Sequence, residues 1–126
     1  RRIVSKTNYV IQTDTRKQHI IPQSNFSKQT EWILYAEEAD LLNVALFGCT
    51  AKQWREANPE LVRENKNIRD FATINQLAVL SNLETHNAEL IKENIDKIER
   101  FHKLTAIATY QINILNNADS LKKLKP

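Results

Sequence analysis

The stretch that decides the fold of this chain is Leu-Leu-Asn-Val-Ala-Leu-Phe at residues 41–47, followed by Gly48. A helix of this composition is apolar almost all round, so this part of the chain must be buried. Gly48 stands where many helices end on a left-handed residue, a conformation that glycine adopts without strain. Upstream, apolar residues keep helical spacing back to Ser27, a residue type that favours the N-cap position. We therefore expect one helix from Ser27 to Phe47, buried at its C-terminal end.

A short helix should follow Gly48. Thr50 and Gln53 have the spacing of a capping box, in which each side chain bonds to the other residue's backbone N–H. This helix contains Trp54 and stops before Pro59, because the residue that precedes a proline disfavours helical dihedral angles. Residues 58–69 are polar and read as a connection that contains at most one helical turn.

A second capping box, Thr73 with Gln76, begins a long amphipathic helix that ends at a joint near Asn94. The final helix follows this joint and carries an apolar stripe at helical spacing. The stripe consists of Ile98, Phe101, Leu104, Ala108, Ile112 and Leu115. Ile107 and Ile114 lie off this stripe, which predicts that the last helix is central in the bundle or buries a second face against another chain.

The N-terminal segment is ambiguous. Its residues fit two periodicities, a strand-like alternation at Thr7, Tyr9, Ile11 and Thr13 and a helical spacing at Ile3, Thr7, Val10 and Asp14. Propensity favours the strand, because β-branched residues are frequent. We nevertheless expect a helix, ended by Pro22.

The fold class we expect is all-α, a compact bundle of about four to five helices with short joints, one of them the short helix after Gly48. Residues 1–22 form a basic N-terminal helix or linker, residues 23–121 form the bundle, and residues 122–126 form a disordered basic tail.

Composition limits the function classes. A chain of 126 residues, 26% charged and 41% hydrophobic, fits one domain. It has no apolar run of the ~18 residues that span a bilayer and no signal-peptide core, so we expect a soluble, intracellular protein. The single cysteine, Cys49, excludes an internal disulfide, and one glycine supplies no phosphate loop. No methionine is present, so we expect the sequence to be part of a longer polypeptide.

Charge is unevenly distributed. Residues 1–30 contain six basic residues and one acidic residue, whereas residues 31–49 contain four acidic residues and no basic one. Such runs usually form a solvated surface. The alternative is a phosphate-contacting face. Its candidate residues are Arg1, Arg2, Lys6, Arg16 and Lys17.

No combination of residues indicates catalysis. The histidines are scattered, and Glu84 and His86 would point to different faces of a helix, so we predict no metal site, no cofactor and no enzymatic activity. Cys49 reads as a small buried hydrophobe. Asp40, at the edge of the buried run, would need a basic partner if it is enclosed, and Arg55 and Arg69 are the candidates.

Several blocks of the sequence carry a family resemblance. Residues 35–55 read Tyr-Ala-Glu-Glu-Ala-Asp-Leu-Leu-Asn-Val-Ala-Leu-Phe-Gly-Cys-Thr-Ala-Lys-Gln-Trp-Arg, and further blocks lie at residues 67–73, 80–84, 87–91 and 99–108. Together they resemble the C-terminal region of bacterial and phage KilA-N domain proteins over nearly the whole chain. Residues 60–66 are longer than is usual for that region, and Cys49 replaces a more typical methionine.

The resemblance implies a cytoplasmic protein of a bacterium or a phage, in which an upstream KilA-N domain, absent from this sequence, binds DNA. It assigns no role to any residue here. Our leading hypothesis is a non-enzymatic accessory domain for self-association or partner binding, without contact to a membrane. The alternative is that the basic N-terminal segment itself contacts nucleic acid.

Two residue sets follow from this hypothesis. An apolar interface would use Trp32, Leu46, Phe47, Ile107 and Ile114. A buried hydrogen-bond network that fixes helix packing would use Asp40, Arg55, Arg69, Asp70, Asn82 and Asn87. A ligand pocket lined by such polar residues is the alternative to the second set.

Overall fold

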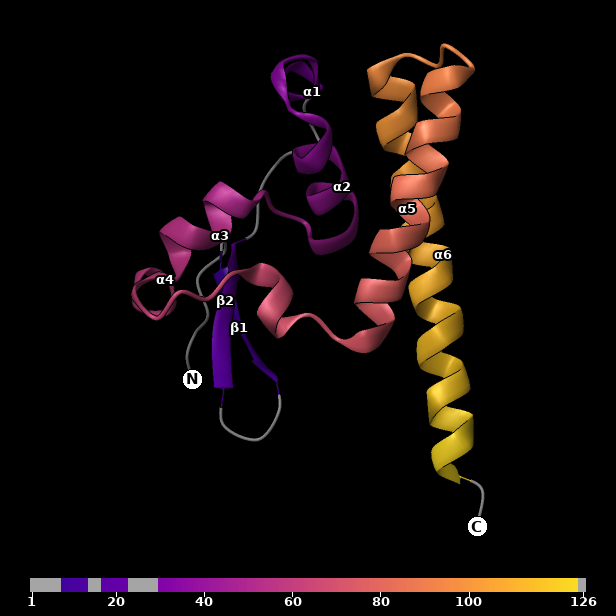
Figure 1. Cartoon of the computed structure of the whole chain (residues 1–126). Helices are drawn as coiled ribbons and strands as arrows, with labels where there is room; N and C mark the ends of the chain where they lie inside the picture. The colour runs from indigo at the N-terminus through magenta and orange to yellow at the C-terminus, as the bar shows by residue number, and fades with distance from the viewer. Residues whose placement is uncertain (1–7, 14–16, 23–29, 125–126) are drawn as a thin grey trace.

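The computed structural model describes residues 8–13, 17–22 and 30–124, and their side chains over 19–22 and 30–121. The elements follow in the order β1 (Asn8–Thr13), β2 (Lys17–Pro22), α1 (Glu31–Tyr35), α2 (Glu38–Phe47), α3 (Ala51–Ala57), α4 (Pro59–Arg63), a 3₁₀ turn η2 (Ile68–Phe71), α5 (Ile74–Lys92) and α6 (Lys97–Leu124). The described chain is thus a helical bundle, which confirms the predicted class, with one β-hairpin added (Figure 1).

The prediction of an N-terminal helix was wrong. β1 and β2 pair antiparallel from Asn8 opposite Pro22 to Thr13 opposite Lys17. Here the β-branched alternation decided the local structure, and helical spacing did not. Pro22 closes the last pair of the ladder, a position that tolerates the missing N–H. β2 lies against α3, so the described part of residues 1–22 packs on the helical region.

The predicted helix over residues 27–47 is two helices. Ala36 and Glu37 are extended, with ψ of 145° and 161°, and separate α1 from α2. The predicted N-cap at Ser27 lies outside the described residues, and α1 begins after Thr30. The predicted end is confirmed, because Gly48 has a φ of 84° and its N–H donates to the carbonyl of Val44 at 3.0 Å.

Both predicted capping boxes are confirmed. At α3, Thr50 and Gln53 exchange bonds of 2.9 and 3.1 Å between side chain and backbone, and Thr73 and Gln76 do the same at α5. The connection over residues 58–69 is more ordered than expected. Pro59 does not only end α3 but also occupies the first turn of α4, where its missing N–H costs nothing.

α5 and α6 form an antiparallel helical hairpin whose joint contains Asn94 at a φ of 62°, as predicted near that residue. α6 has 28 residues and continues to Leu124, so residues 122–124 are helical in the backbone, where a disordered tail was predicted. Residues 125–126 lie outside the described part. α2 packs across one side of the hairpin (Figure 1).

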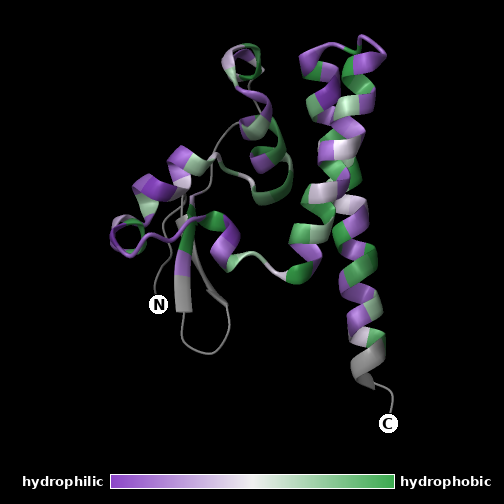
Figure 2. Cartoon of the chain, in the orientation of Figure 1, coloured by the Kyte–Doolittle hydropathy of each residue, from purple (hydrophilic) through white to green (hydrophobic). Residues whose placement is uncertain are grey.

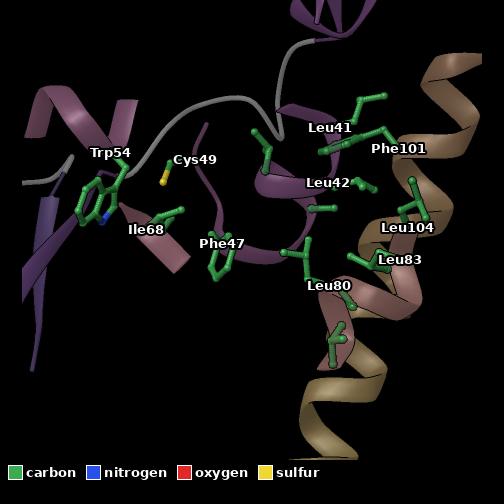
Figure 3. Packing of buried hydrophobic residues seen from close by; sticks show 14 of the residues in the cluster. Leu41, Leu42, Phe47, Cys49, Trp54, Ile68, Leu80, Leu83, Phe101 and Leu104 are labelled. Carbon is green, nitrogen blue, oxygen red and sulfur yellow. The ribbon is translucent and has the colours of Figure 1, made fainter. Parts of the chain in front are cut away.

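The core lies where α2 meets the α5–α6 hairpin. Leu41 and Leu42 of α2 face Leu83 of α5 and Leu104 of α6 (Figure 3). α2 is mostly hydrophobic along its length, as its burial requires (Figure 2). The same buried cluster continues through Phe47 toward α3, where Trp54 is fully buried.

Candidate interaction surface on the last helix

α6 has two apolar faces, and only one of them is covered. The predicted inner stripe is confirmed, since its central residues Phe101, Leu104 and Ala108 are at most 6% exposed. Its outer members Ile98, Ile112 and Leu115 are partly buried against the same cluster. A helix of 28 residues is about 42 Å long, so α6 extends well beyond the region that α2 covers.

The second face is exposed. We define the outer stripe as Ile107, Tyr110, Ile114, Asn117 and Leu121. The exposed fractions of Tyr110, Ile114 and Leu121 are 67%, 47% and 62%, while Ile107 is partly buried. The spacings alternate between three and four residues, which is the a/d pattern of a coiled-coil seam. In this part of α6, hydrophobic and hydrophilic residues alternate along the ribbon (Figure 2).

The central part of the outer stripe lies in an uncharged run of α6. Between Lys103 and Asp119 the sequence of α6 contains no charged residue, although 26% of the chain is charged. Solvent-facing helix surfaces normally carry charged residues, and the cores of protein interfaces are depleted of them. An uncharged run on an exposed helix face is therefore the composition of a contact surface.

Amide hydrogen bonds join α5 to this half of α6, in addition to the apolar packing of Ile112 and Leu115 against the core. The Asn75 amide donates to Asn116 at 3.0 Å and to Asp119 at 2.8 Å, and the Asn82 amide donates to Gln111 at 3.0 Å. These amide contacts lie along the side of α6 that faces α5.

Only part of the predicted interface lies on this surface. Ile107 and Ile114 belong to the outer stripe, as their position off the inner stripe suggested. The other three belong to the chain's own packing, which corrects the prediction. Trp32 packs edge-on against Phe101 with ring centroids 5.1 Å apart, Phe47 is buried, and Leu46 packs partly buried against the core.

The observed polar network has different members from the predicted one. Arg100, whose side chain is 9% exposed, donates to Glu38 at 2.8 Å, to Asn87 at 3.1 Å and to the carbonyl of Ile95 at 3.2 Å. The Asn87 amide also donates to Glu38 at 2.8 Å, and Lys97 donates to the carbonyl of Ala36 at the α1–α2 break. The network ties α2 to α5 and α6.

Glu38 is ionised in this network. Burial alone would raise the pKa of its carboxyl, but hydrogen bonds from Asn87 and Arg100, together with the charges of Arg100 and Lys97, outweigh burial and lower that pKa. Glu38 and Arg100 were not singled out from the sequence. Arg100 does carry a signal, because it stands one residue before Phe101, on the edge of the apolar stripe.

Of the predicted network residues, only Asn87 is buried in this network. Within the described residues Asp40 forms no ion pair with Arg55 or Arg69, which corrects that prediction; Arg55 is exposed, and Arg69 lies 3.6 Å from Glu84. The exposed residues Asp70 and Asn82 have local roles, since Asp70 accepts from the N–H of Asn67 at 2.8 Å and Asn82 bonds to Gln111.

A second buried polar cluster joins the β1–β2 hairpin to α3. His19 Nδ1 accepts from Trp54 Nε1–H at 2.9 Å, and the His19 ring stacks on Phe71 at 4.8 Å. Asn58 accepts from the N–H of Ile20 at 2.7 Å and donates to the carbonyls of Ile20 and Trp54, both at 2.8 Å. Burial lowers the pKa of His19, so the ring is neutral and accepts the indole bond.

Two open cavities of the described residues bear on the ligand-pocket alternative. One of about 420 Å³ lies between β2, α3 and α4, and one of about 620 Å³ lies between α1 and the start of α6. Neither is lined by any of the six predicted network residues, and the one polar amide beside them, Asn58 in the smaller cavity, bonds to Ile20 and Trp54. The buried polar residues make their bonds within the protein instead.

The remaining predicted sites are placed as follows. Arg1, Arg2, Lys6 and Arg16 lie outside the described residues, and Lys17 begins β2. Cys49 is fully buried, and burial raises the pKa of its thiol to about 12. Over the described ranges, no three His, Cys, Asp or Glu side chains group as metal ligands would, and no helix has the length and apolar character needed to cross a membrane.

Searches with this chain against protein-family models, curated proteins and solved structures find no match.

Proposed function

We propose that this chain is a non-enzymatic accessory domain of a KilA-N-type DNA-binding protein and that it self-associates through the outer stripe of α6. The sequence blocks that resemble the KilA-N family support the first part. The observation that carries the second part is the exposed a/d seam in an uncharged run of α6. DNA binding itself belongs to the upstream domain of such proteins.

The area of the outer stripe predicts a weak association. Its exposed side chains offer roughly 300 Å² per copy, given that an aromatic side chain such as Tyr110 buries about 150–250 Å² and that Ile114 and Leu121 are smaller. Stable protein interfaces bury about 1,200–2,000 Å² in total. We therefore expect a dimer whose dissociation constant is micromolar or higher. Its apparent affinity would rise if a second pair of domains in the same polypeptide also associated.

Light scattering of the purified chain from about 10 μM to about 1 mM tests this proposal, because that range brackets weak dissociation constants. We expect the average molar mass to rise toward that of a dimer. Ile114→Lys should abolish the rise, since it places a charge in the middle of the seam. Ile91→Lys is the matched control, because Ile91 lies on α5 and is exposed to nearly the same extent, 44% against 47%.

A monomer at every concentration would contradict self-association, and a dimer that survives Ile114→Lys would contradict the surface. We expect both variants to fold, because neither residue belongs to the buried core. Far-UV circular dichroism checks that they do.

A second candidate function is direct contact with nucleic acid, favoured by the excess of basic residues among residues 1–30. Its test is retardation of duplex DNA at low and at physiological salt. Phosphate contacts weaken steeply as salt rises, whereas an apolar interface does not. Absence of retardation at low salt would exclude this function for the chain.

A further inference from the structure

We infer that protonation of His19 loosens the docking of the β1–β2 hairpin on α3, while the core between α2 and the α5–α6 hairpin stays folded. Mild acid then acts on one contact of the fold, the one between β2 and α3 (Figure 1). This contact involves no residue of α6, so the inference holds or fails independently of self-association.

The hydrogen bond between His19 and Trp54 forms only while His19 is neutral. Trp54 Nε1–H donates to His19 Nδ1 at 2.9 Å. The indole nitrogen is a donor only, whereas a protonated imidazole donates at both of its nitrogens. Protonation therefore sets two N–H groups against each other where one hydrogen bond had been. The bond that links β2 to the buried Trp54 is lost.

The surroundings of His19 do not compensate for a positive charge. The residue is 6% exposed, and its ring lies against the rings of Trp54 and Phe71. β1 has no charged residue, and β2 has only Lys17. The charged residues of the other elements around His19 are all exposed: Lys52, Arg55 and Glu56 on α3, Glu60 and Arg63 on α4, and Arg69 and Asp70 on η2.

Glu60 is the only acidic residue that lines a cavity together with His19, among the residues that the structure describes. Its side chain is 84% exposed and lies 3.7 Å from Arg63. The carboxylate is therefore solvated and already has a cationic neighbour. Burial prevails, and it lowers the pKa of His19.

Few interactions attach the hairpin to the helices. The described side chains show three hydrogen bonds across this contact: His19 to Trp54, and Asn58 to the N–H and to the carbonyl of Ile20. The hairpin supplies one residue, Ile21, to the buried hydrophobic cluster, and residues 33–108 supply the rest. Most of the cluster is therefore built without the hairpin, and the hairpin can leave while the core remains.

Proton linkage sets the size of the response. A released His19 titrates near its ordinary pKa of 6.5, and the docked residue titrates at a lower pH. Between these two values, the ratio of released to docked hairpin rises by up to about tenfold for each unit that the pH falls, because release takes up one proton. Outside this range the ratio stays constant, since His19 then has the same charge in both states.

Hydrogen exchange measured by NMR on the wild-type chain, from about pH 7.5 to about pH 5, tests this inference. The Ile20 amide reports release, because its N–H donates to Asn58 across the contact, and the Leu104 amide reports the core. Protection is the intrinsic exchange rate at each pH divided by the observed rate. We expect Ile20 protection to fall between pH 6.5 and the midpoint of the His19 ring titration, and to stay at least about tenfold below Leu104 protection.

Urea distinguishes local release from global unfolding. Release of the hairpin exposes less surface than unfolding, so Ile20 protection should depend on urea less steeply than Leu104 protection does. Equal protection of the two amides, with equal urea dependence, would overturn local release. Ile20 protection that does not change with pH would overturn the role of the proton, as would a His19 ring that titrates at pH 6.5 or above.

His19→Gln removes the titrating group and keeps an acceptor for the indole. We expect Ile20 protection in this variant to be constant over the same pH range. His102→Gln is the matched control, because His102 is an exposed histidine on α6, and it should keep the wild-type pH dependence. A wild-type pH dependence in His19→Gln would assign the response to another group. The wild-type measurement decides the question by itself if His19→Gln does not fold.

Discussion

Replacing Arg100 by methionine tests whether the buried polar network stabilises the fold. Methionine keeps most of the aliphatic volume of the arginine stem and removes its three hydrogen bonds. The cost depends on what each abandoned partner can do next. Asn87 is 5% exposed, so its amide oxygen is left without a partner, at about 1–3 kcal/mol.

The Glu38 side chain is 46% exposed, so its carboxylate can turn toward water, and the loss there is smaller. Breaking a fully buried ion pair costs about 3–5 kcal/mol, and this half-open pair must cost less. We therefore expect Arg100→Met to lower the free energy of unfolding by about 2–3 kcal/mol, dominated by the buried amide.

Urea unfolding followed by far-UV circular dichroism measures this change, with the m value unchanged if the variant keeps two-state behaviour. Lys103→Met is the matched control. It makes the same charge change on the same helix, at a side chain that is 48% exposed and 3.7 Å from Glu99, and should cost less than about 0.5 kcal/mol.

Acid supplies a second readout of the same network. Because the folded pKa of Glu38 lies below its value of 4.5 in the unfolded chain, its stabilisation is present above pH 4.5 and is lost as the pH falls through the folded pKa. Arg100→Met should weaken that loss. A change in unfolding free energy no larger than that of Lys103→Met would refute the reasoning.

Three further predictions follow from single residues. Gly48→Ala should cost about 1–2 kcal/mol in unfolding free energy, because φ is 84° while no atom lies near the added Cβ, so the cost is backbone strain alone; no measurable loss in urea would contradict it. The Cys49 thiol should not react with a thiol reagent until the protein is unfolded, since it is fully buried and its pKa is raised to about 12; reaction in native buffer would show that the core opens readily. Burial lowers the pKa of His19, so its contribution to stability is present above the unfolded value of 6.5 and is lost as the pH falls toward the folded pKa. His19→Gln keeps an acceptor for the Trp54 indole. In this variant the free energy of unfolding should change less between pH 7.5 and pH 5 than in the wild type, because only the remaining titratable groups contribute to the slope.

Sequence reasoning succeeded where one local interaction sets the structure. Gly48 ends α2 and the two capping boxes begin α3 and α5, because each depends on residues at most four positions apart. It failed at the α1–α2 break. Nothing in the sequence around Ala36 forbids a helix, and the break lets α1 pack Trp32 on Phe101, a contact made far along the chain.

Only part of the candidate surface could be predicted from the sequence. The position of Ile107 and Ile114 off the inner stripe indicated a second face, but the sequence could not show which apolar residues the chain covers itself. Phe47 and Ile114 are both large hydrophobic residues on helices, yet Phe47 is 9% exposed and Ile114 is 47% exposed. The polar network was missed for the same reason, since Glu38 and Arg100 meet only through tertiary packing.

The Asn58 side chain ties the β1–β2 hairpin to the helices. It bonds to both the N–H and the carbonyl of Ile20, as a neighbouring strand would, across 38 residues of sequence. Closing a loop of that length costs about 3 kcal/mol in chain entropy, which the bonds of Asn58 and the packing of β2 on α3 must outweigh. In a longer polypeptide, any force that reaches the hairpin acts on the helices through the Asn58 and His19 bonds to this segment.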